Sequence, residues 1–231
     1  MFFFNPMFLV FIGPGLLLAL YATMKTKSTF GKYSQVGSSR GYTGAEAAHE
    51  MLRRSEISNV SIERVGGMLT DHYDPMHKTL RLSEQVYGSR SLSAIGIACH
   101  EAGHAIQHAH GYAALSLRTA LVPVTNLCST LYVWVIIIGA FMHRPHLAMI
   151  GVVMLAVAVL FAIVTLPVEW DASRRAKIAM ANAGLLSSQE AGHAAKVLNA
   201  AFLTYLASAI TSILTLVYWL MQLGFFGGSD D

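Results

Sequence analysis

One short motif in the sequence has residue types and a spacing that suit hydrolytic chemistry. It is His100-Glu101-Ala102-Gly103-His104, of the form HExxH. Positions four apart lie on one face of a helix, so His100 and His104 can direct their imidazoles at a single metal ion. Glu101 lies beside them and can polarise a metal-bound water as general base. The motif therefore predicts a hydrolytic zinc site, with Zn²⁺ as the cofactor.

A motif this short also arises by chance, in which case the histidines are ordinary residues of a helix surface. The flanking residues favour the metal, since positions 94–99 and 105–106 are small or aliphatic and indicate a buried face. Buried imidazoles need partners, which a metal supplies. Gly96 is the one helix breaker in the run that precedes the motif, residues 91–100, so we predict a helix over about residues 91–110.

A catalytic zinc site uses three protein ligands and leaves one position open for water. His110 lies six residues after His104, the offset found in metzincins, but that geometry needs a glycine at position 107, which is Gln here. Glu169 is a lone carboxylate at the end of an apolar stretch, where it would be costly without a cationic partner. We favour Glu169 as the third ligand and keep His110 as the alternative.

The composition is that of a membrane protein. Of the 231 residues, 54% are hydrophobic and 13% are charged, whereas soluble domains carry about 25% charged residues. Four apolar stretches are long enough, or nearly so, to cross a bilayer as helices; they cover residues 7–24, 121–142, 147–168 and 200–226. The first resembles a signal peptide in length, but basic residues follow it and none precede it, which favours an anchor.

The basic residues predict the topology. Of the 16 Lys and Arg residues, 11 fall between Lys25 and Arg118 and four between Arg174 and Lys196. The positive-inside bias places residues 25–120 and 169–198 in the cytoplasm, and the loop at 143–146 and both termini outside. The motif and Glu169 then share one side of the membrane. The net charge of +3 is explained by these flanking residues, so we expect no nucleic-acid partner.

The expected fold is mainly α: a polytopic membrane protein with about four transmembrane helices and a cytoplasmic α+β domain of the zincin type that carries the HExxH helix. The expected domains are a first transmembrane helix (1–24), a cytoplasmic metallopeptidase domain (25–120), a transmembrane hairpin (121–168), a cytoplasmic helix with the third ligand (169–198) and a last transmembrane helix with a short tail (199–231).

Within the cytoplasmic domain, Thr43 and Glu46 fit a capping box that starts a helix ending near Arg54. Residues 60–62 and 78–83 alternate between apolar and polar side chains, as short strands do. We expect a hairpin or a small three-stranded sheet before the motif helix.

Between these strands lies a polar cluster, Asp71-His72-Tyr73-Asp74-Pro75-Met76-His77. Asp-Pro starts turns well, so the cluster fits an ordinary turn. Alternatively, His72, Tyr73 or His77 reaches the zinc site and stabilises the oxyanion of a tetrahedral intermediate, and the sequence leaves the choice open. An extended substrate could pair with the neighbouring strand edge.

The order of the motifs resembles that of the YugP-type neutral zinc metallopeptidases of bacterial membranes. The matching segments run over nearly the whole chain: residues 69–75, 80–83, 100–107, 169–176 and 198–205. More distantly, the plan is similar to that of the HtpX-like membrane proteases, in which an HExxH helix and a later Glu-x-x-x-Asp helix bind zinc at the cytoplasmic face.

This resemblance implies that His100, His104 and Glu169 bind zinc and that Glu101 is the base. The chain departs from the HtpX-like pattern at Ser173, where an Asp would orient a histidine ligand. Asp171 is a candidate replacement for that role.

The expected function is that of a membrane-embedded, zinc-dependent endopeptidase with a gluzincin-like ligand set, acting on membrane proteins or peptides at the cytoplasmic face of the cell membrane. Its expected partners are those substrates and the lipid bilayer. An intramembrane site is disfavoured because His100 precedes the second apolar stretch by about 20 residues. The alternative is a catalytically silent or zinc-stabilised membrane scaffold, which would not need Glu101.

Overall fold

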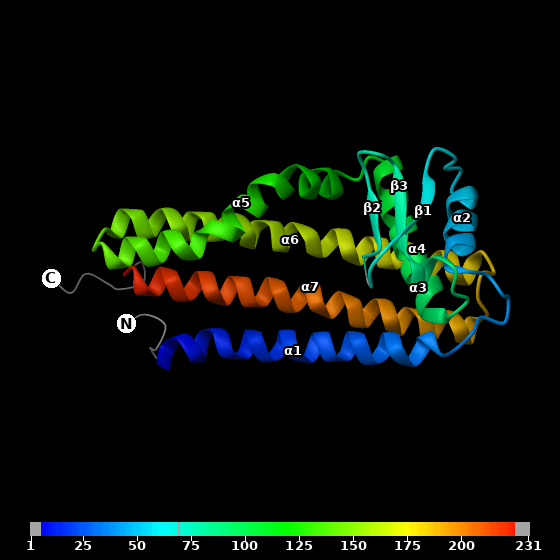
Figure 1. Cartoon of the computed structure of the whole chain (residues 1–231), viewed down its shortest axis with the longest axis horizontal. Helices are drawn as coiled ribbons and strands as arrows, with labels where there is room; N and C mark the ends of the chain where they lie inside the picture. Colours follow the sequence, from blue (N-terminus) through cyan, green and yellow to red (C-terminus); the bar gives the residue numbers. More distant parts are fainter. Residues whose placement is uncertain (1–5, 69, 225–231) are drawn as a thin grey trace. The chain divides into compact units, whose positions relative to one another are not determined.

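The computed structural model describes residues 6–68 and 70–224 (Figure 1). Its helices are α1 (Pro6–Ser34), α2 (Gly44–Arg54), α3 (Glu84–Tyr87), α4 (Leu92–Ala109), α5 (Ala113–Phe141), α6 (Pro145–Asn182) and α7 (Ser188–Gln222). Its strands are β1 (Ser61–Val65), β2 (His72–Asp74) and β3 (Thr79–Ser83). The last two residues of the fourth apolar stretch, and Leu69 at the start of one family motif, lie outside the described residues.

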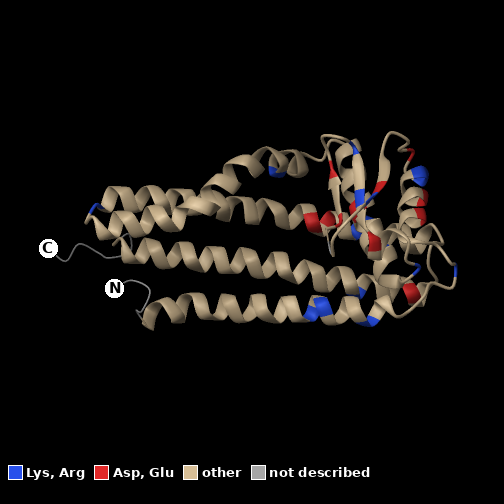
Figure 2. Cartoon of the chain, in the orientation of Figure 1, with Lys and Arg blue, Asp and Glu red and all other residues tan. Residues whose placement is uncertain are grey.

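The chain forms two compact units. The first comprises residues 1–21, 117–166 and 204–231, and the second comprises residues 22–116 and 167–203. Charged side chains belong almost entirely to the second unit (Figure 2). In the described part of the first unit, Arg118 and Arg144 are the only Lys, Arg, Asp or Glu residues.

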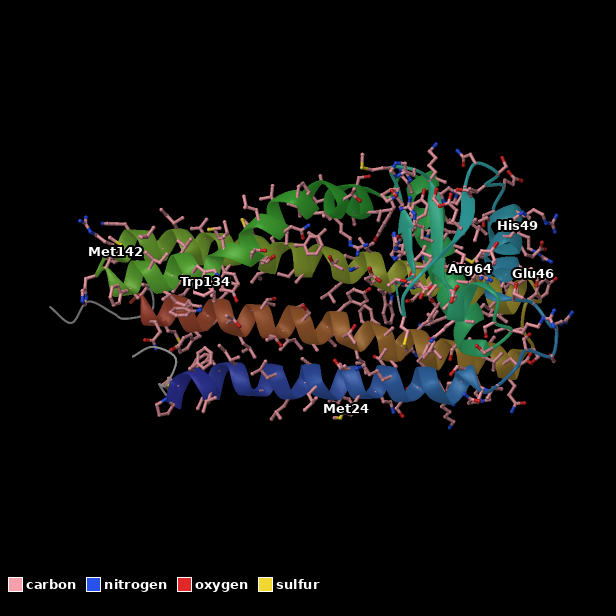
Figure 3. All side chains as sticks on the ribbon, in the orientation of Figure 1. Met24, Glu46, His49, Arg64, Trp134 and Met142 are labelled. Atoms are coloured by element: carbon pink, nitrogen blue, oxygen red, sulfur yellow. The ribbon has the colours of Figure 1, made fainter. Side chains whose placement is uncertain are left out.

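Four of the described helices, α1, α5, α6 and α7, are long and apolar enough to cross a membrane, as the sequence predicts. The most apolar window of each is only 17–28% buried, so most of its side chains face outward. Trp134 on α5 is 61% exposed, and Met142, the residue that follows α5, is 56% exposed (Figure 3). Such surfaces suit a lipid environment, because exposing them to water opposes folding.

In the first unit, α5 and α6 pack closely because small residues lie at their contact. A Cβ atom added at Gly151 would lie 2.9 Å from both the Ile136 nitrogen and the Tyr132 oxygen of α5. Tight backbone approach of this kind is typical of helix pairs in membranes. Around it the apolar core of this unit contains Ile136, Val152, Leu155, Val159, Tyr218 and Trp219.

The second unit contains a three-stranded sheet in the order β1-β3-β2. β3 is central, parallel to β1 and antiparallel to β2. The strands expected near residues 60–62 and 78–83 are present. The turn expected over residues 71–77 occupies only the second half of that segment, because His72–Asp74 forms strand β2 and pairs with β3. Asp71 fastens this segment by accepting hydrogen bonds from the Ser83 backbone nitrogen and hydroxyl, at 2.7 and 3.1 Å.

The motif helix α4 lies in the core of the second unit. Ser91 caps its first turn, since the serine hydroxyl accepts a hydrogen bond from the Ala94 nitrogen at 3.2 Å. Its side chains are buried on nearly every side from Leu92 to Gln107, where the core also includes residues of α2 and β3. The expected capping box of α2, between Thr43 and Glu46, is present. A helix buried all round holds its side chains rigidly, which suits a site that needs fixed geometry.

Candidate metal centre

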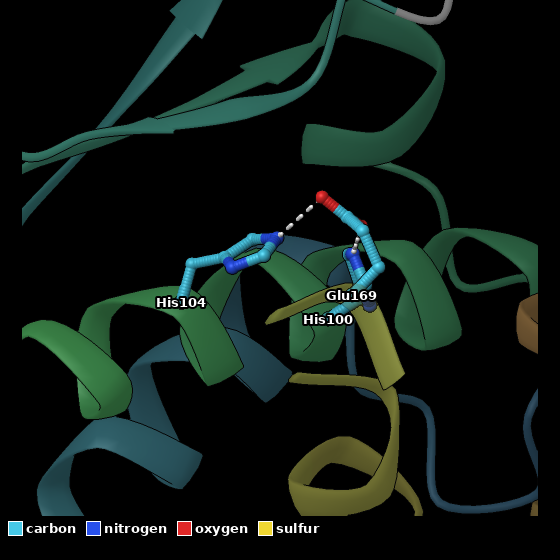
Figure 4. A group of neighbouring side chains, drawn as sticks. All are labelled: His100, His104 and Glu169. Atoms are coloured by element: carbon cyan, nitrogen blue, oxygen red, sulfur yellow. Dashed lines mark hydrogen bonds and ion pairs between the residues drawn. The ribbon is translucent and has the colours of Figure 1, made fainter. Parts of the chain in front are cut away.

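Two helices of the second unit bring three potential metal ligands together. His100 and His104 lie one turn apart on α4, and Glu169 extends from α6 toward both imidazoles (Figure 4). One donor atom from each residue lies within 4.8 Å of the other two. The His100 Nε2 atom is 3.1 Å from Glu169 Oε2, and the His104 Nε2 atom is 3.7 Å from Glu169 Oε1.

These distances suit a zinc ion. Zinc with tetrahedral bonds of about 2.05 Å holds neighbouring donor atoms about 3.3 Å apart, a value between the two distances in the cluster. The donors are also buried, with His104 6% and Glu169 1% exposed. Two imidazoles and one carboxylate are a ligand set that zinc accepts in catalytic sites. The residues present therefore fit a zinc ion.

A glycine inside the motif lets the two helices approach. A Cβ atom added at Gly103 would lie 2.6 Å from the Ala172 carbonyl oxygen on α6. The obstacle is backbone, so a side chain here would push the helices apart instead of displacing a flexible group. Ala172 lies less than one turn from Glu169, so this contact sets the distance between the motif and its third donor.

The orientation of His104 is fixed by a buried amide. Gln107 is fully buried, and its Oε1 atom is 3.0 Å from His104 Nδ1. The amide nitrogen donates to the Val168 carbonyl at 2.8 Å and to the Asp171 carboxylate at 3.0 Å. Both of those groups are acceptors, so the amide cannot be turned round. Nδ1 of His104 must then donate to Gln107, which leaves the Nε2 lone pair for a metal.

His100 has a different partner. Its Nδ1 atom lies 3.1 Å from the hydroxyl of Ser173, which is 3% exposed. Ser173 thus lies against a histidine of the three-donor cluster, although the chain has no Asp at this position. Asp171 accepts hydrogen bonds from Gln107, and from Arg174 and Arg175 at 2.9 and 2.6 Å, so it is linked to His104 through the Gln107 amide.

Gln107 is a residue that the sequence analysis missed, because it entered there only as the absence of a glycine. The signal available in the sequence was a polar residue three positions after His104, on the same face of a helix with apolar flanks. A buried amide at that spacing needs acceptors and donors of its own. The donor is His104 of the same helix, but the two acceptors come from α6, which the sequence does not place beside α4.

Glu101 is 8% exposed, and its carboxylate makes no hydrogen bond or ion pair with any residue that the structure describes. A buried carboxylate without protein partners has its acceptor sites available to water or a substrate amide. The neighbouring thiol is inert, because burial raises the pKa of Cys99 to about 12 and keeps it protonated.

Tyr73 lies against the motif helix. Its hydroxyl is 2.8 Å from Nδ1 of His108, which is one turn beyond His104 on α4. Burial raises the pKa of Tyr73, and the negative charge of Asp74 raises it further. The phenol therefore stays protonated at neutral pH and can donate a hydrogen bond.

The other three candidates have partners elsewhere. The ring of His72 is 2.7 Å from the Thr70 carbonyl, and the ring of His77 is 2.7 Å from the Asp74 carboxylate with its side chain 71% exposed. His110 is exposed at the C-cap of α4, outside the cluster of three donors.

Comparisons with known proteins agree with this geometry. Residues 8–224 match the family described as "Putative neutral zinc metallopeptidase". The chain is 42% identical over 214 residues to the "Putative membrane protease YugP" of Bacillus subtilis (strain 168), an alignment that covers 93% of this chain and 94% of that protein. No solved structure matches the chain. Because the match takes in both the HExxH helix and Glu169, the chain belongs to this family of neutral zinc metallopeptidases.

Proposed function

We propose that this chain is a zinc-dependent endopeptidase of the cell membrane that cleaves membrane proteins or peptides at the cytoplasmic face. The observation that carries the proposal is the meeting of His100, His104 and Glu169 beside a buried Glu101 that has no partner among the described residues. A site built only to hold structural zinc would have no use for that fourth group.

A zinc ion held by these three residues would lower the pKa of water in its open position to near 7 and polarise a substrate carbonyl. Glu101 accepts the proton of the attacking water on a carboxylate oxygen and returns it to the nitrogen of the leaving amine. Gln107 holds the His104 imidazole with its proton on Nδ1, and Ser173 lies at the same atom of His100. These contacts at Nδ1 would leave both Nε2 atoms available to bind the metal.

Tyr73 is the best supported donor for the oxyanion among the three residues considered. It keeps its proton at neutral pH and lies beside α4 one turn beyond the second histidine. Tyr73 contacts the motif helix itself, through His108, whereas the partners of His72 and His77, Thr70 and Asp74, lie outside that helix.

The sheet supports a mode of substrate binding. In the order β1-β3-β2, strand β2 pairs with β3 on one side only, among the described residues. Tyr73 of the same strand lies against the motif helix. We propose that an extended peptide pairs with the open edge of β2, a common mode of peptide recognition that would bring its backbone past the metal centre.

The placement at the cytoplasmic face rests on the distribution of charge. Fifteen of the 16 Lys and Arg residues fall in residues 25–118 and 174–196, the segments that flank the apolar stretches on one side. Substrates at that face are membrane proteins or the loops that emerge from them.

The test measures metal content and cleavage together on protein purified in detergent. Wild type, Glu101→Gln and the control Glu84→Gln, at an exposed position on α3, are assayed for zinc and for cleavage of casein and of a reconstituted membrane protein. We expect about one zinc per chain in all three, and cleavage by wild type and Glu84→Gln only. Zinc in all three without cleavage in any would favour the scaffold instead, and wild type without zinc would refute the proposal.

A further inference from the structure

Within the second unit, α1 and α7 run antiparallel and are held together at two places. The Thr26 hydroxyl donates to the Ala200 carbonyl at 2.8 Å. Two turns further along both helices, the rings of Tyr33 and His193 stack with their centroids 5.0 Å apart. The two contacts define a segment of about two turns along which one face of each helix lies beside the other.

A cavity of about 580 Å³ lies along this segment, a volume typical of small-molecule sites. Both helices line it with positions spaced i, i+3, i+4 and i+7, the pattern of a single helix face. They are Lys25, Ser28, Thr29 and Lys32 of α1 and Lys196, Asn199, Ala200 and Leu203 of α7, with Tyr33 at one end. We call this cavity the lysine groove.

The lysine groove carries an excess of positive charge. Lys25, Lys32 and Lys196 form no ion pair with any acidic residue that the structure describes. The hydroxyls of Ser28 and Thr29 add two uncharged donors between the lysines of α1. Lysine and hydroxyl side chains that line one cavity without a carboxylate suit a phosphate group.

The groove begins where the apolar stretches end. Lys25 directly follows the stretch at 7–24, and Asn199 directly precedes the one that starts at Ala200. The Thr26–Ala200 hydrogen bond holds these two boundaries at the same level. For helices that cross a bilayer, this is the depth of the lipid headgroups, where basic pockets between helices bind anionic lipids.

We propose that the lysine groove binds the phosphate of an anionic phospholipid, with ammonium groups from both helices and the hydroxyls of Ser28 and Thr29 as its donors. This inference goes beyond the proposed peptidase activity and does not depend on it. Basic residues beside a span can also serve topology alone, but that role needs only their number, not their convergence on one cavity. Lys27 distinguishes lipid binding from a role in topology alone. It is exposed within one turn of Lys25 on α1 but does not line the groove.

The test is thermal unfolding of the full chain in a nonionic detergent, titrated with dioleoylphosphatidylglycerol, with dioleoylphosphatidylcholine or with inorganic phosphate. We expect saturable stabilisation by phosphatidylglycerol only. Lys25→Gln, Lys32→Gln and Lys196→Gln each raise the half-saturating lipid concentration about five-fold, and the triple variant about 100-fold. Lys27→Gln, the matched control of equal charge change, leaves it unchanged.

Equal effects of Lys27→Gln and the three groove variants would overturn the proposal, since charge alone would then explain the binding. Equal stabilisation by phosphatidylcholine would overturn it too. Saturable stabilisation by inorganic phosphate, with the same dependence on the groove lysines, would overturn the lipid as the source of the phosphate. All variants are at exposed positions, and their unfolding temperatures without lipid show directly whether they fold.

Discussion

Replacing Gln107 with Met tests how the site holds its second histidine. Met preserves much of the volume and removes the amide, so Nδ1 of His104 loses its acceptor and Asp171 and Val168 lose a donor. The imidazole can then rotate and carry its proton on either nitrogen. Loss of a group that orients a metal ligand typically weakens metal affinity about 10- to 100-fold. That factor corresponds to about 1.4–2.7 kcal/mol.

The assay is the zinc dissociation constant from competition with a chelating dye, together with the unfolding temperature of the metal-free protein. Ser93→Ala is the matched control, because Ser93 is also fully buried on α4 and its hydroxyl donates to the Phe30 carbonyl at 2.8 Å. We expect both variants to lose stability and only Gln107→Met to lose zinc affinity. A folded Gln107→Met protein that binds zinc as tightly as wild type would refute the role of the amide.

A pair of substitutions, at Gln107 and Asp171, tests which groups donate the hydrogen bonds around the buried amide. In Gln107→Glu, a carboxylate oxygen would face the Asp171 carboxylate and the Val168 carbonyl, two acceptors that can give it no proton. Adding Asp171→Asn supplies an amide donor in place of one of them. We expect the double variant to bind zinc more tightly than Gln107→Glu alone, as measured by a double-mutant cycle. If the losses of zinc affinity in the two single variants simply added in the double variant, the result would contradict this hydrogen-bond network.

Three other measurements follow from contacts and charges in the second unit. Gly103→Ala should lower the unfolding free energy by about 1–3 kcal/mol and weaken zinc binding, because its Cβ meets the Ala172 carbonyl, whereas Gly192→Ala in α7, with nothing within 4 Å, should stabilise by about 0.5–1 kcal/mol. Burial acts to raise the pKa of Glu190, but hydrogen bonds from Ser187 and Ser39 outweigh it and hold the pKa at about 2, below the ordinary 4.5. The stabilisation by this carboxylate is therefore present above about pH 5 and lost as the pH falls toward 2, so the stability difference between wild type and Glu190→Gln should shrink over that range in chemical unfolding. Removing zinc with a chelator should lower the unfolding temperature, and restoring free zinc to about 1,000 times its dissociation constant should recover about 4 kcal/mol; equal unfolding with and without zinc would count against the metal centre.

The sequence predicts those features that depend on local pattern. The helix around His100 and the apolar helices follow from composition and periodicity, and the structure has both. Glu169 could be singled out because a carboxylate at the end of an apolar stretch needs a partner. Gln107 and β2 could not be foreseen in their roles, because each depends on a segment distant in the sequence: α6 for the amide and β3 for the strand.

The 69 residues that separate His100 from Glu169 also impose an order on biosynthesis. A nascent chain that ends before Glu169 already contains HExxH but only two of the three donors. At about 5–20 residues per second, translation needs several more seconds to add the third. The two apolar stretches at 121–142 and 147–168 are made in that interval. The full set of three donors is therefore completed only after both apolar stretches have been synthesised, so a nascent chain that ends before Glu169 lacks the candidate metal centre.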